Sequence, residues 1–372
     1  MEFKFFLPTR VFFGNDAVSK SAEYLKQLGK RCLLVTGRFS SKRNGSLDDI
    51  TDVLKKNNIA YEIYDEVEEN PSFETVETIG KKAKEMGADF LIGIGGGSAM
   101  DSAKAGAILA MNDIDVADLW TKNLVNKPLS VCAVPTTSGT GSEVTQYSVL
   151  TNRKKKSKRG FANEQIFPVI SCLNPGYTLT MNDFLTINTG IDALSHAVEG
   201  YLSKRASPLM DKIALKAIGL IRDHLPLVLQ NPKALEKRSQ MMYASMLAGI
   251  VIAHTGTIIL HGMGYPLTTY LSIPHGRANG MLMCGVLEMI RPSRKEKVAR
   301  IAECFGKENG DLGGLEAFIK GFGIDTMEYR KKVTKKMLEE FADFASKTSN
   351  IRNTPGVITE KNIRDVYLEE FT

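Results

Sequence analysis

The sequence predicts two domains: an α/β domain built on a parallel sheet flanked by helices, and an all-helical domain. In the first half, short apolar segments of strand length alternate with amphipathic helical patterns, which is typical of a helix-covered parallel sheet. After Asn174-Pro175, long helical patterns continue to the C-terminus with few strand candidates. We place the boundary near Met181, which gives domains 1–181 and 182–372. The 372 residues, 43% of them hydrophobic, suffice for both cores.

Short apolar runs bounded by polar turns form the predicted sheet. They are Arg31–Thr36, Tyr61–Tyr64, Asp89–Ile94, Leu129–Val134 and Phe167–Ser171. The aromatic N-terminal stretch MEFKFFLPTRVFFG is also strand-like, and it lacks the basic start and small-residue cleavage site of a signal peptide. Export is therefore not indicated.

A glycine-rich turn follows the predicted strand Asp89–Ile94. The segment Gly95 to Ser98 (GGGS) leads directly into a helix that carries Asp101. Glycines at such a turn let backbone amides approach a diphosphate, and the helix N-terminus adds the positive end of its dipole. The turn departs from GxGxxG because Ser98 takes the place of the last glycine. We interpret it as a dinucleotide phosphate site; a tight turn without a ligand is the alternative.

A second polar turn, Pro135 to Thr145 (PTTSGTGSEVT), also follows an apolar strand. It concentrates hydroxyls and glycines at the strand ends, where parallel sheets bind their ligands. Two such turns at neighbouring strand ends predict a dinucleotide-binding domain.

The end of the strand Arg31–Thr36 bears on the choice of cofactor. It continues into Gly37, with no carboxylate to hold a ribose 2′-hydroxyl. Arg38, Ser40 and Lys42 follow, and these side chains could meet a 2′-phosphate. We therefore predict NADP(H) in preference to NAD(H).

Composition narrows the possible partners and the compartment. The formal charge of +6 favours anionic ligands but does not require a nucleic acid partner. We interpret the basic run Arg153 to Arg159 as a solvated hairpin loop; the alternative is that one of its lysines lies near the cofactor. Five scattered cysteines without a CxxC pair are typical of reduced core residues in a cytoplasmic protein. The longest apolar stretch, Met246 to Leu260, is shorter than a membrane span and is predicted to be a buried helix.

The second half carries a candidate metal site. In Thr186 to Leu202 the apolar residues recur at helical spacing, so Asp192 and His196 lie one turn apart on one face. His261 and His275 follow later and bring the set to three imidazoles and one carboxylate. These ligand types fit Fe²⁺ or Zn²⁺, and a bound cation would explain a carboxylate on an apolar face.

A further histidine, His254, precedes His261 by seven residues on roughly the same face of the expected helix. A histidine on an apolar helix is more often a core residue than a ligand. We interpret His254 as a pocket-lining or core residue.

Taken together, these motifs resemble those of the iron-containing (group III) alcohol dehydrogenases. The resemblance covers nearly the whole chain through VFFGN, GGGS with Asp101, TTSGTGSEVT, TGIDALSHAVEGY, LHGMGYPL and IPHG. It implies a fold like that of dehydroquinate synthase, and a metal ion held by Asp192, His196, His261 and His275. It also implies cofactor contacts from Gly37, Asn70, Gly95, Gly96, Gly97, Ser98, Asp101, Thr136, Thr137, Thr140, Lys158 and Leu179.

The activity that the resemblance implies is hydride transfer between NADP(H) and a small primary alcohol or aldehyde, of the butanol or 1,3-propanediol kind. The metal would act as a Lewis acid. Many relatives have a further histidine four residues after the third ligand, where this chain has Tyr265. His275 and Tyr265 are the candidate catalytic residues, Tyr265 as a proton relay or as a space-filling side chain. Ile252, Tyr147 and Tyr265 are candidates to line a substrate pocket, with core packing as the alternative.

Other functions stay open at the level of the sequence. A zinc-dependent glycerol or polyol dehydrogenase would share the architecture. A metal-dependent hydrolase would use the same ligands but would not need the GGGS turn, and a third alternative is a non-catalytic metal- or nucleotide-binding protein. We expect a cytoplasmic homodimer or larger homo-oligomer that acts on a small molecule and binds neither nucleic acid nor membrane.

Overall fold

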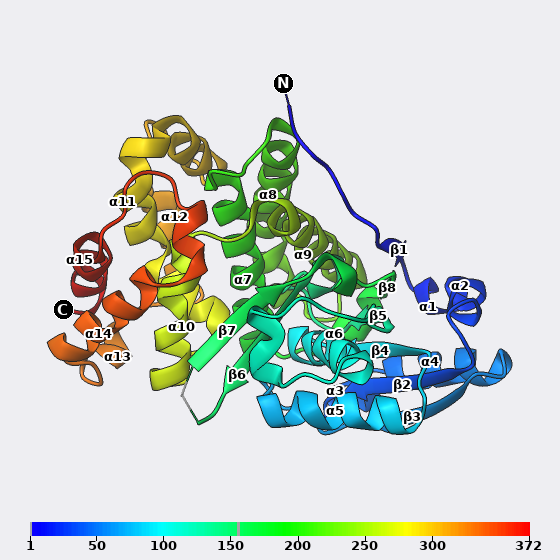
Figure 1. The fold of residues 1–372 in the computed structure, drawn as a ribbon. Coiled ribbons are helices and arrows are strands. Elements are labelled where there is room, and N and C mark those ends of the chain that lie inside the picture. Colours follow the sequence, from blue (N-terminus) through cyan, green and yellow to red (C-terminus); the bar gives the residue numbers. More distant parts are fainter. Residues whose placement is uncertain (1, 155–156) are drawn as a thin grey trace. The chain divides into compact units, whose positions relative to one another are not determined.

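The computed structural model describes residues 2–154 and 157–372, which form two compact units (Figure 1). The α/β unit comprises Phe6–Asn182 and Asn231–Met242. The helical unit comprises Asp183–Gln230, Tyr243–Thr372 and the N-terminal residues up to Phe5. The parallel sheet of one unit and the helical make-up of the other confirm the predicted fold class.

The α/β unit is built on a six-stranded parallel sheet in the order β1-β8-β5-β4-β2-β3 (Figure 1). The strands are β1 (Arg10–Phe13), β2 (Arg31–Thr36), β3 (Ala60–Tyr64), β4 (Phe90–Gly95), β5 (Ser130–Pro135) and β8 (Ile170–Leu173). Every residue of β4 is buried, as expected for a central strand that is covered on both faces.

Alternate residues of the strands pack on opposite faces of the sheet. Cys32 and Leu34 contribute to a core that includes residues of α1 (Ala17–Lys20), α2 (Ala22–Lys26) and α4 (Ser46–Lys56). Leu33 and Val35 contribute to a second core with α5 (Phe73–Glu85) and α6 (Gly97–Met111). Because helices cover both faces of the sheet, β2 is buried throughout after its first residue.

Shorter elements complete the α/β unit. They are α3 (Ser40–Arg43), the 3₁₀ helices η1 (Val116–Trp120), η2 (Ser142–Val144), η3 (Glu164–Ile166) and η4 (Pro175–Thr180), and the antiparallel hairpin of β6 (Tyr147–Asn152) and β7 (Ser157–Ala162). The basic run Arg153 to Arg159 connects these two strands, as expected for a hairpin, although its residues 155 and 156 lie outside the described part of the chain.

The predicted strands agree with the observed ones to within one residue at their starts, except for the last. The segment predicted as Phe167–Ser171 begins its strand only at Ile170. Two local features delay it: Glu164–Ile166 forms a 3₁₀ helix, and Pro168 has no N–H to donate to a neighbouring strand.

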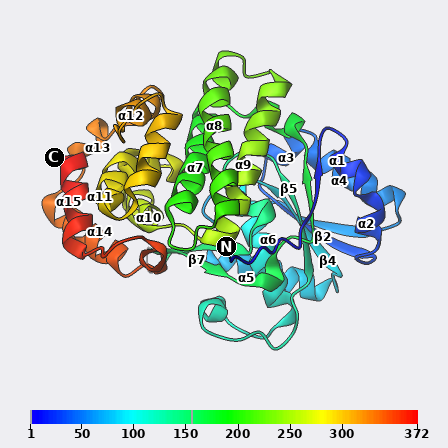
Figure 2. The ribbon, with the colours of Figure 1, turned by 90° about the horizontal axis from the view of Figure 1, so that it is seen from above.

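The helical unit is formed by long helices and short C-terminal ones. They are α7 (Asp183–Leu202), α8 (Pro208–Gln230), α9 (Leu235–Thr255, which begins in the α/β unit), α10 (Ile259–Leu271), α11 (His275–Cys304), α12 (Gly313–Lys320), α13 (Met327–Arg330), α14 (Lys335–Ser346), η5 (Ser349–Asn353) and α15 (Glu360–Phe371). Helix α7 packs against α8 and α11 (Figure 2) and is buried on all sides from Gly190 to Leu202.

The expectation of one buried helix over Met246 to Leu260 is wrong. Helix α9 ends at Thr255 and α10 begins at Ile259, with the two axes bent by 112°. Gly256 adopts a φ of +63°, a left-handed conformation that ends the helix at little cost only for glycine. His254 and His261 therefore do not share a helix face.

No single helix among the described residues is long and apolar enough to cross a membrane. Only the bent pair of α9 and α10 meets such a test of length and composition when its two helices are taken together.

Candidate metal centre and dinucleotide site

Three helices of the helical unit bring the predicted metal ligands together. Asp192 comes from the middle of α7, His261 from the first turn of α10, and His275 is the first residue of α11. One ligand atom from each of these three residues lies within 4.8 Å of the other two. Asp192 and His261 are buried, and Asp192 Oδ1 lies 4.0 Å from His261 Nε2. A carboxylate and two imidazoles thus converge inside a packed helical core.

The fourth predicted ligand and the candidate proton relay lie beside this group as stacked rings. The His196 ring stacks on the His261 ring with centroids 4.7 Å apart and an angle of 24° between the planes. The Tyr265 ring stacks on the His275 ring at 5.4 Å and 10°. His254 is elsewhere in the same unit, stacked on Phe5 at 4.8 Å, with its Nδ1 2.7 Å from the carbonyl of Ile250.

Glycines allow the three helices to approach so closely. A Cβ on Gly276 would lie 1.9 Å from the carbonyl oxygen of Asn188 and 2.9 Å from the backbone nitrogen of Asp192, so the start of α11 touches the backbone of α7. A Cβ on Gly264 of α10 would lie 2.2 Å from Oδ1 of Asn279 in α11. Each of these glycines lies within three residues of a predicted ligand, and a larger side chain would separate the ligands.

Asn279 is a residue of this site that the sequence reasoning missed. Its Nδ2 lies 3.4 Å from Asp192 Oδ1, 3.5 Å from His261 Nε2 and 3.5 Å from His275 Nε2. The three ligand atoms therefore surround the same small volume, in which the two hydrogens of the Asn279 amide can be donated to at most two of them at a time. The four-residue spacing from His275, one helical turn, was the available signal.

The donor set fits a divalent cation. The two imidazoles and one carboxylate that converge are ligand types that suit Fe²⁺ or Zn²⁺, and a carboxylate on a buried helix face is stabilised by a bound cation. The buried Oδ1 of Asn279 has no hydrogen-bond partner within residues 2–154 and 157–372, which marks the site as a polar space inside the core.

In the α/β unit the two polar turns lie against each other. Gly95, at the end of β4, has a φ of +150° that favours glycine, and its carbonyl accepts a hydrogen bond of 2.9 Å from the amide of Thr136. A Cβ on Gly97 would lie 2.8 Å from Cγ2 of Thr140, and one on Gly96 would lie 3.4 Å from Oγ1 of Thr137. The backbone of the GGGS turn is therefore fitted closely to the threonines of the second turn.

Other predicted cofactor residues gather at the same strand ends. Lys158 Nζ donates to Asn70 Oδ1 at 2.8 Å, and the amide of Asn70 donates to Ser98 Oγ at 3.3 Å. Asn70 has a φ of +55°, which turns the chain after β3 toward the GGGS turn. A lysine, an amide and a hydroxyl thus lie together where a helix N-terminus would face a diphosphate.

Asp101 lies behind these turns and holds them together. Its Oδ1 accepts from Ser142 Oγ at 2.6 Å, and its Oδ2 accepts from the amide of Val149 at 2.9 Å. The fully buried Lys104 donates to the carbonyl of Ser142 at 2.6 Å and to that of Tyr147 at 2.9 Å. Burial raises the pKa of Asp101 and lowers that of Lys104 to about 8. Asp101 supports the turns through protein contacts of its own.

Glu143, buried beside this cluster, gives a prediction about pH. Burial raises its pKa from 4.5 to about 7, so its contribution to stability is fully present below pH 4.5 and is lost as the pH rises through about 7. Glu143→Gln should therefore gain stability relative to the wild type between pH 5 and pH 8, by at most about 3 kcal/mol. Thermal unfolding of both proteins across this range measures it; a melting-temperature difference that is the same at both ends would contradict it.

The remaining predicted cofactor residues lie near the end of β2. A Cβ on Gly37 would lie 3.3 Å from the carbonyl of Val67, so the position is tight but open on its other sides. Ser40 begins the short helix α3, and Lys42 pairs with Asp65 at 2.6 Å. Leu179, in η4, accepts a hydrogen bond from Lys233 at its carbonyl. The ion pair at Lys42 and the hydrogen bond at Leu179 are thus made with residues outside the GGGS turn.

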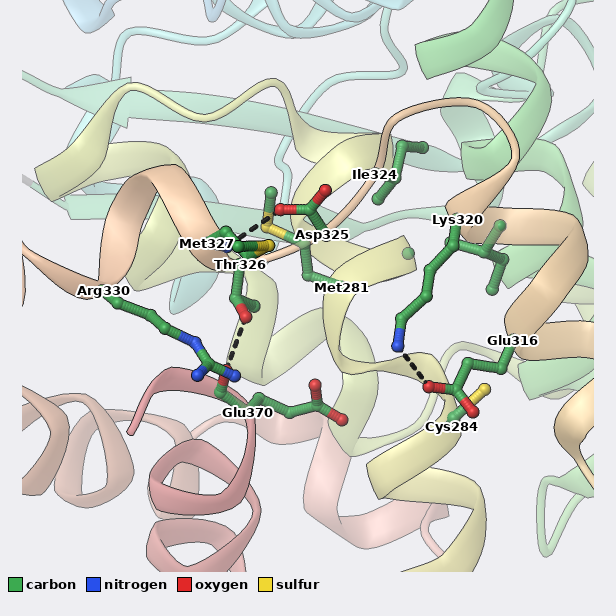
Figure 3. Close-up of a pocket in the computed structure, with 12 residues that line it drawn as sticks. Met281, Cys284, Glu316, Lys320, Ile324, Asp325, Thr326, Met327, Arg330 and Glu370 are labelled. Carbon is green, nitrogen blue, oxygen red and sulfur yellow. Dashed lines mark hydrogen bonds and ion pairs between the residues drawn. The ribbon is translucent and has the colours of Figure 1, made fainter.

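A cavity of about 360 Å³ opens elsewhere in the helical unit (Figure 3). Met281 and Cys284 of α11 line it together with the ion pair of Lys320 and Glu316. Burial raises the pKa of the Cys284 thiol to about 12, so this sulfur is a thiol at neutral pH. None of the predicted metal ligands lines the cavity.

Comparison with known proteins identifies the family. Residues 8–175 match the family described as iron-containing alcohol dehydrogenase, and residues 186–371 match the C-terminal part of the same Fe-containing family. The chain belongs to the iron-containing alcohol dehydrogenase family, and it is an oxidoreductase of the iron type that acts on alcohols.

Relatives and solved structures agree with this assignment. An iron-containing alcohol dehydrogenase from Thermotoga maritima has 43% identity and a TM-score of 0.91, over 100% of this chain and 99% of that one. The NAD-dependent methanol dehydrogenase of Bacillus methanolicus is 31% identical over 97% of this chain and 98% of its own length. The NADPH-dependent butanol dehydrogenase of Clostridium saccharobutylicum is 33% identical over 89% of each chain.

Proposed function

We propose that this protein interconverts small primary alcohols and aldehydes with NADP(H), using Fe²⁺, or Zn²⁺ as the alternative, held by Asp192, His196, His261 and His275. The observation that carries the proposal is the convergence of the buried Asp192 carboxylate of α7, the buried His261 imidazole of α10 and the half-buried His275 imidazole of α11. When bound, such an ion polarises an alcohol or carbonyl oxygen as a Lewis acid, and the nicotinamide supplies or accepts the hydride.

The chain's own residues then have separate tasks. In the α/β unit, the GGGS turn and the threonines fitted to it bind the diphosphate through backbone amides and hydroxyls. In the helical unit, the aromatic ring of Tyr265 lies flat on His275 and fixes the orientation of that imidazole. We assign to the Tyr265 hydroxyl the transfer of the proton to or from the substrate oxygen. His275 and Tyr265 are thus the proposed catalytic pair.

Tyr265→Phe tests this assignment. The Phe ring keeps the stack on His275 but loses the hydroxyl, so we expect kcat to fall about 10²-fold, as is typical for loss of a general acid or base, while bound metal stays unchanged. The control is Tyr270→Phe on the same helix, where the hydroxyl belongs to a side chain that is 57% exposed and packs on Phe341. Normal kinetics of Tyr265→Phe from pH 6 to pH 10 would remove Tyr265 from the mechanism.

The preference for NADP(H) rests on the end of β2. Gly37 offers no carboxylate there to accept the ribose hydroxyls of NAD, and Arg38 and Ser40 can donate to a 2′-phosphate. Asp65, which directly follows β3, is paired with a cation of this region: its pKa is lowered because it accepts a hydrogen bond from Lys42. Known relatives include both an NAD-dependent and an NADPH-dependent enzyme, so the residues at this strand end carry the argument.

Gly37→Asp should reverse this preference. The new carboxylate repels a 2′-phosphate and accepts from both ribose hydroxyls, so the ratio of kcat/KM for NADPH over NADH should fall more than about tenfold, or about 1.4 kcal/mol. Gly37→Ala is the matched control, because its Cβ meets the same Val67 carbonyl without adding a charge. A wild type that prefers NADH, or an aspartate variant with an unchanged ratio, would refute the NADP(H) proposal.

A substrate panel separates the alternatives. The wild type loaded anaerobically with Fe²⁺ or with Zn²⁺ is assayed with NADPH and NADH on butanal, butanol, 1,3-propanediol and glycerol. We expect the highest kcat/KM for the small primary alcohols or aldehydes. Highest activity on glycerol with Zn²⁺ would instead indicate a polyol dehydrogenase. Ester or amide hydrolysis without any dinucleotide would indicate a hydrolase.

We also propose a cytoplasmic homodimer or larger homo-oligomer. All five cysteines are free, and Cys32, Cys132 and Cys172 are buried, which favours a reducing compartment. Sedimentation of the purified protein tests the oligomeric state.

A further inference from the structure

Glu199 is a fully buried carboxylate in the same helix as Asp192 and His196. It follows Asp192 by seven residues and His196 by three, so all three lie on one face of α7. Burial of an ionisable group without partners would cost several kcal/mol, and Glu199 has partners on both oxygens. Each of these partners belongs to α10 or to the residue that precedes it.

The contacts of Glu199 are directed at His261. Its Oε1 accepts hydrogen bonds from the amide of Ile258 at 3.0 Å and from the amide of His261 at 3.1 Å. Its Oε2 contacts His261 Nδ1. One carboxylate therefore accepts hydrogen bonds from two backbone amides at the start of α10 and also contacts the imidazole of His261. Together these contacts fix both the position and the rotation of the His261 ring.

These contacts also decide which ring nitrogen of His261 carries the proton. An ionised carboxylate only accepts hydrogen bonds, so Nδ1 must be the donor, and in the neutral imidazole, the form that can bind a metal, Nε2 then keeps its lone pair. On the other side of the ring, Asn279 Nδ2, which only donates, lies 3.5 Å from His261 Nε2 and agrees with a lone pair on that nitrogen. Asp192 Oδ1 lies 4.0 Å from the same Nε2, so two lone-pair donors face each other across the space that a cation would fill.

We propose that Glu199 is the positioning residue of the metal centre: it holds His261 in the tautomer whose Nε2 faces Asp192 and thereby sets the affinity of the site for its cation. This inference rests on the proposed metal centre. Outer carboxylates that accept from a ligating histidine raise its basicity and orient its ring, and their removal weakens metal binding about 10- to 100-fold.

Glu199→Gln separates this role from that of a helix cap. The glutamine Oε1 still accepts from the amides of Ile258 and His261, so α10 keeps its cap. The glutamine NH₂ now faces Nδ1 and can only donate, so the proton of His261 moves to Nε2, the nitrogen that would bind the metal. A purely structural role predicts no change in the tautomer or in the metal affinity.

The experiment has two readouts. The first is the ¹⁵N tautomer state of His261 in metal-free protein by NMR, assigned with His261→Ala. The second is the dissociation constant for Zn²⁺ by competition with a chelator. We expect Nδ1–H in the wild type, Nε2–H in Glu199→Gln, and Zn²⁺ binding about 10- to 100-fold weaker in the variant. The matched control is Glu143→Gln, the same change at a buried position of the α/β unit, which should leave both readouts unchanged.

The outcomes are distinguishable. Wild-type His261 with its proton on Nε2 overturns the assignment of Glu199 and requires no variant to fold. Unchanged Zn²⁺ affinity in folded Glu199→Gln also overturns it. If His261→Ala binds Zn²⁺ as tightly as the wild type does, the proposed metal centre itself fails. The tautomer of His261 measured without metal in the wild type still shows whether Glu199 orients the ring.

Discussion

His261→Ala should empty the metal centre and reduce turnover to background while dinucleotide binding stays intact. The imidazole of His261 lies at the centre of the site: it faces Asp192 and Asn279 through Nε2, stacks on His196, and contacts Glu199 through Nδ1. Its removal takes away one ligand and leaves the Glu199 carboxylate with only backbone donors. The loss of metal affinity should exceed the roughly 100-fold that loss of an outer-shell partner produces.

Metal analysis and NADPH fluorescence titration of the purified variant measure both parts of this result. The control is His254→Ala in the same unit, because His254 stacks on Phe5 and stands outside the cluster formed by Asp192, His261 and His275. It should bind metal like the wild type. A His261→Ala protein that keeps stoichiometric metal and near-normal activity would show that the four-ligand assignment is wrong.

Gly276→Ala should damage the same site without touching a ligand. The new Cβ would lie 1.9 Å from the carbonyl oxygen of Asn188, a distance that only a movement of the α7 or α11 backbone can relieve. Such overpacking destabilises by about 1–3 kcal/mol. Because His275 and Asp192 sit on the two backbones that must separate, metal affinity should fall more than about tenfold.

Gly219→Ala is the matched control for this prediction. Gly219 lies in α8 of the same unit, and a Cβ there would meet nothing within 4 Å. The same substitution should stabilise the protein by about 0.5–1 kcal/mol through helix propensity and leave metal binding unchanged. Thermal unfolding and chelator competition compare the two variants. Equal metal affinity in Gly276→Ala and the wild type would mean that the close contact of α7 and α11 does not set the ligand geometry.

Local patterns were sufficient to predict the sheet and the candidate ligands. Four of the predicted strands begin within one residue of the observed strands. A parallel strand that is covered on both faces is apolar along its length, so an apolar run between two turns is enough to locate it. The face shared by Asp192 and His196 likewise follows from helical spacing alone. The convergence of α10 and α11 on that face could not be predicted this way, since it depends on packing across the sequence.

The residues that sequence reasoning missed act through tertiary contacts. Asn279 and Glu199 are ordinary polar residues on helices until α10 is placed beside α7 and α11. The break at Gly256 was missed because an apolar composition on both sides concealed it, and only its φ of +63° separates α9 from α10. The resemblance to the family implied that Asp101 touches the cofactor, yet its carboxylate oxygens accept from Ser142 and Val149. Its direct contact with a dinucleotide stays a prediction.

Reconstitution of metal-free protein tests the account most directly. The wild type is stripped with a chelator under anaerobic conditions and titrated with Fe²⁺, and butanal reduction by NADPH is measured at each step together with bound iron. We predict that the rate rises in proportion to bound iron and stops rising at one ion per chain, and that His261→Ala neither binds the ion nor gains activity. Full turnover by the stripped protein, or a rate in His261→Ala that rises with Fe²⁺ to the wild-type level, would contradict a metal-dependent oxidoreductase whose metal is held by Asp192, His196, His261 and His275.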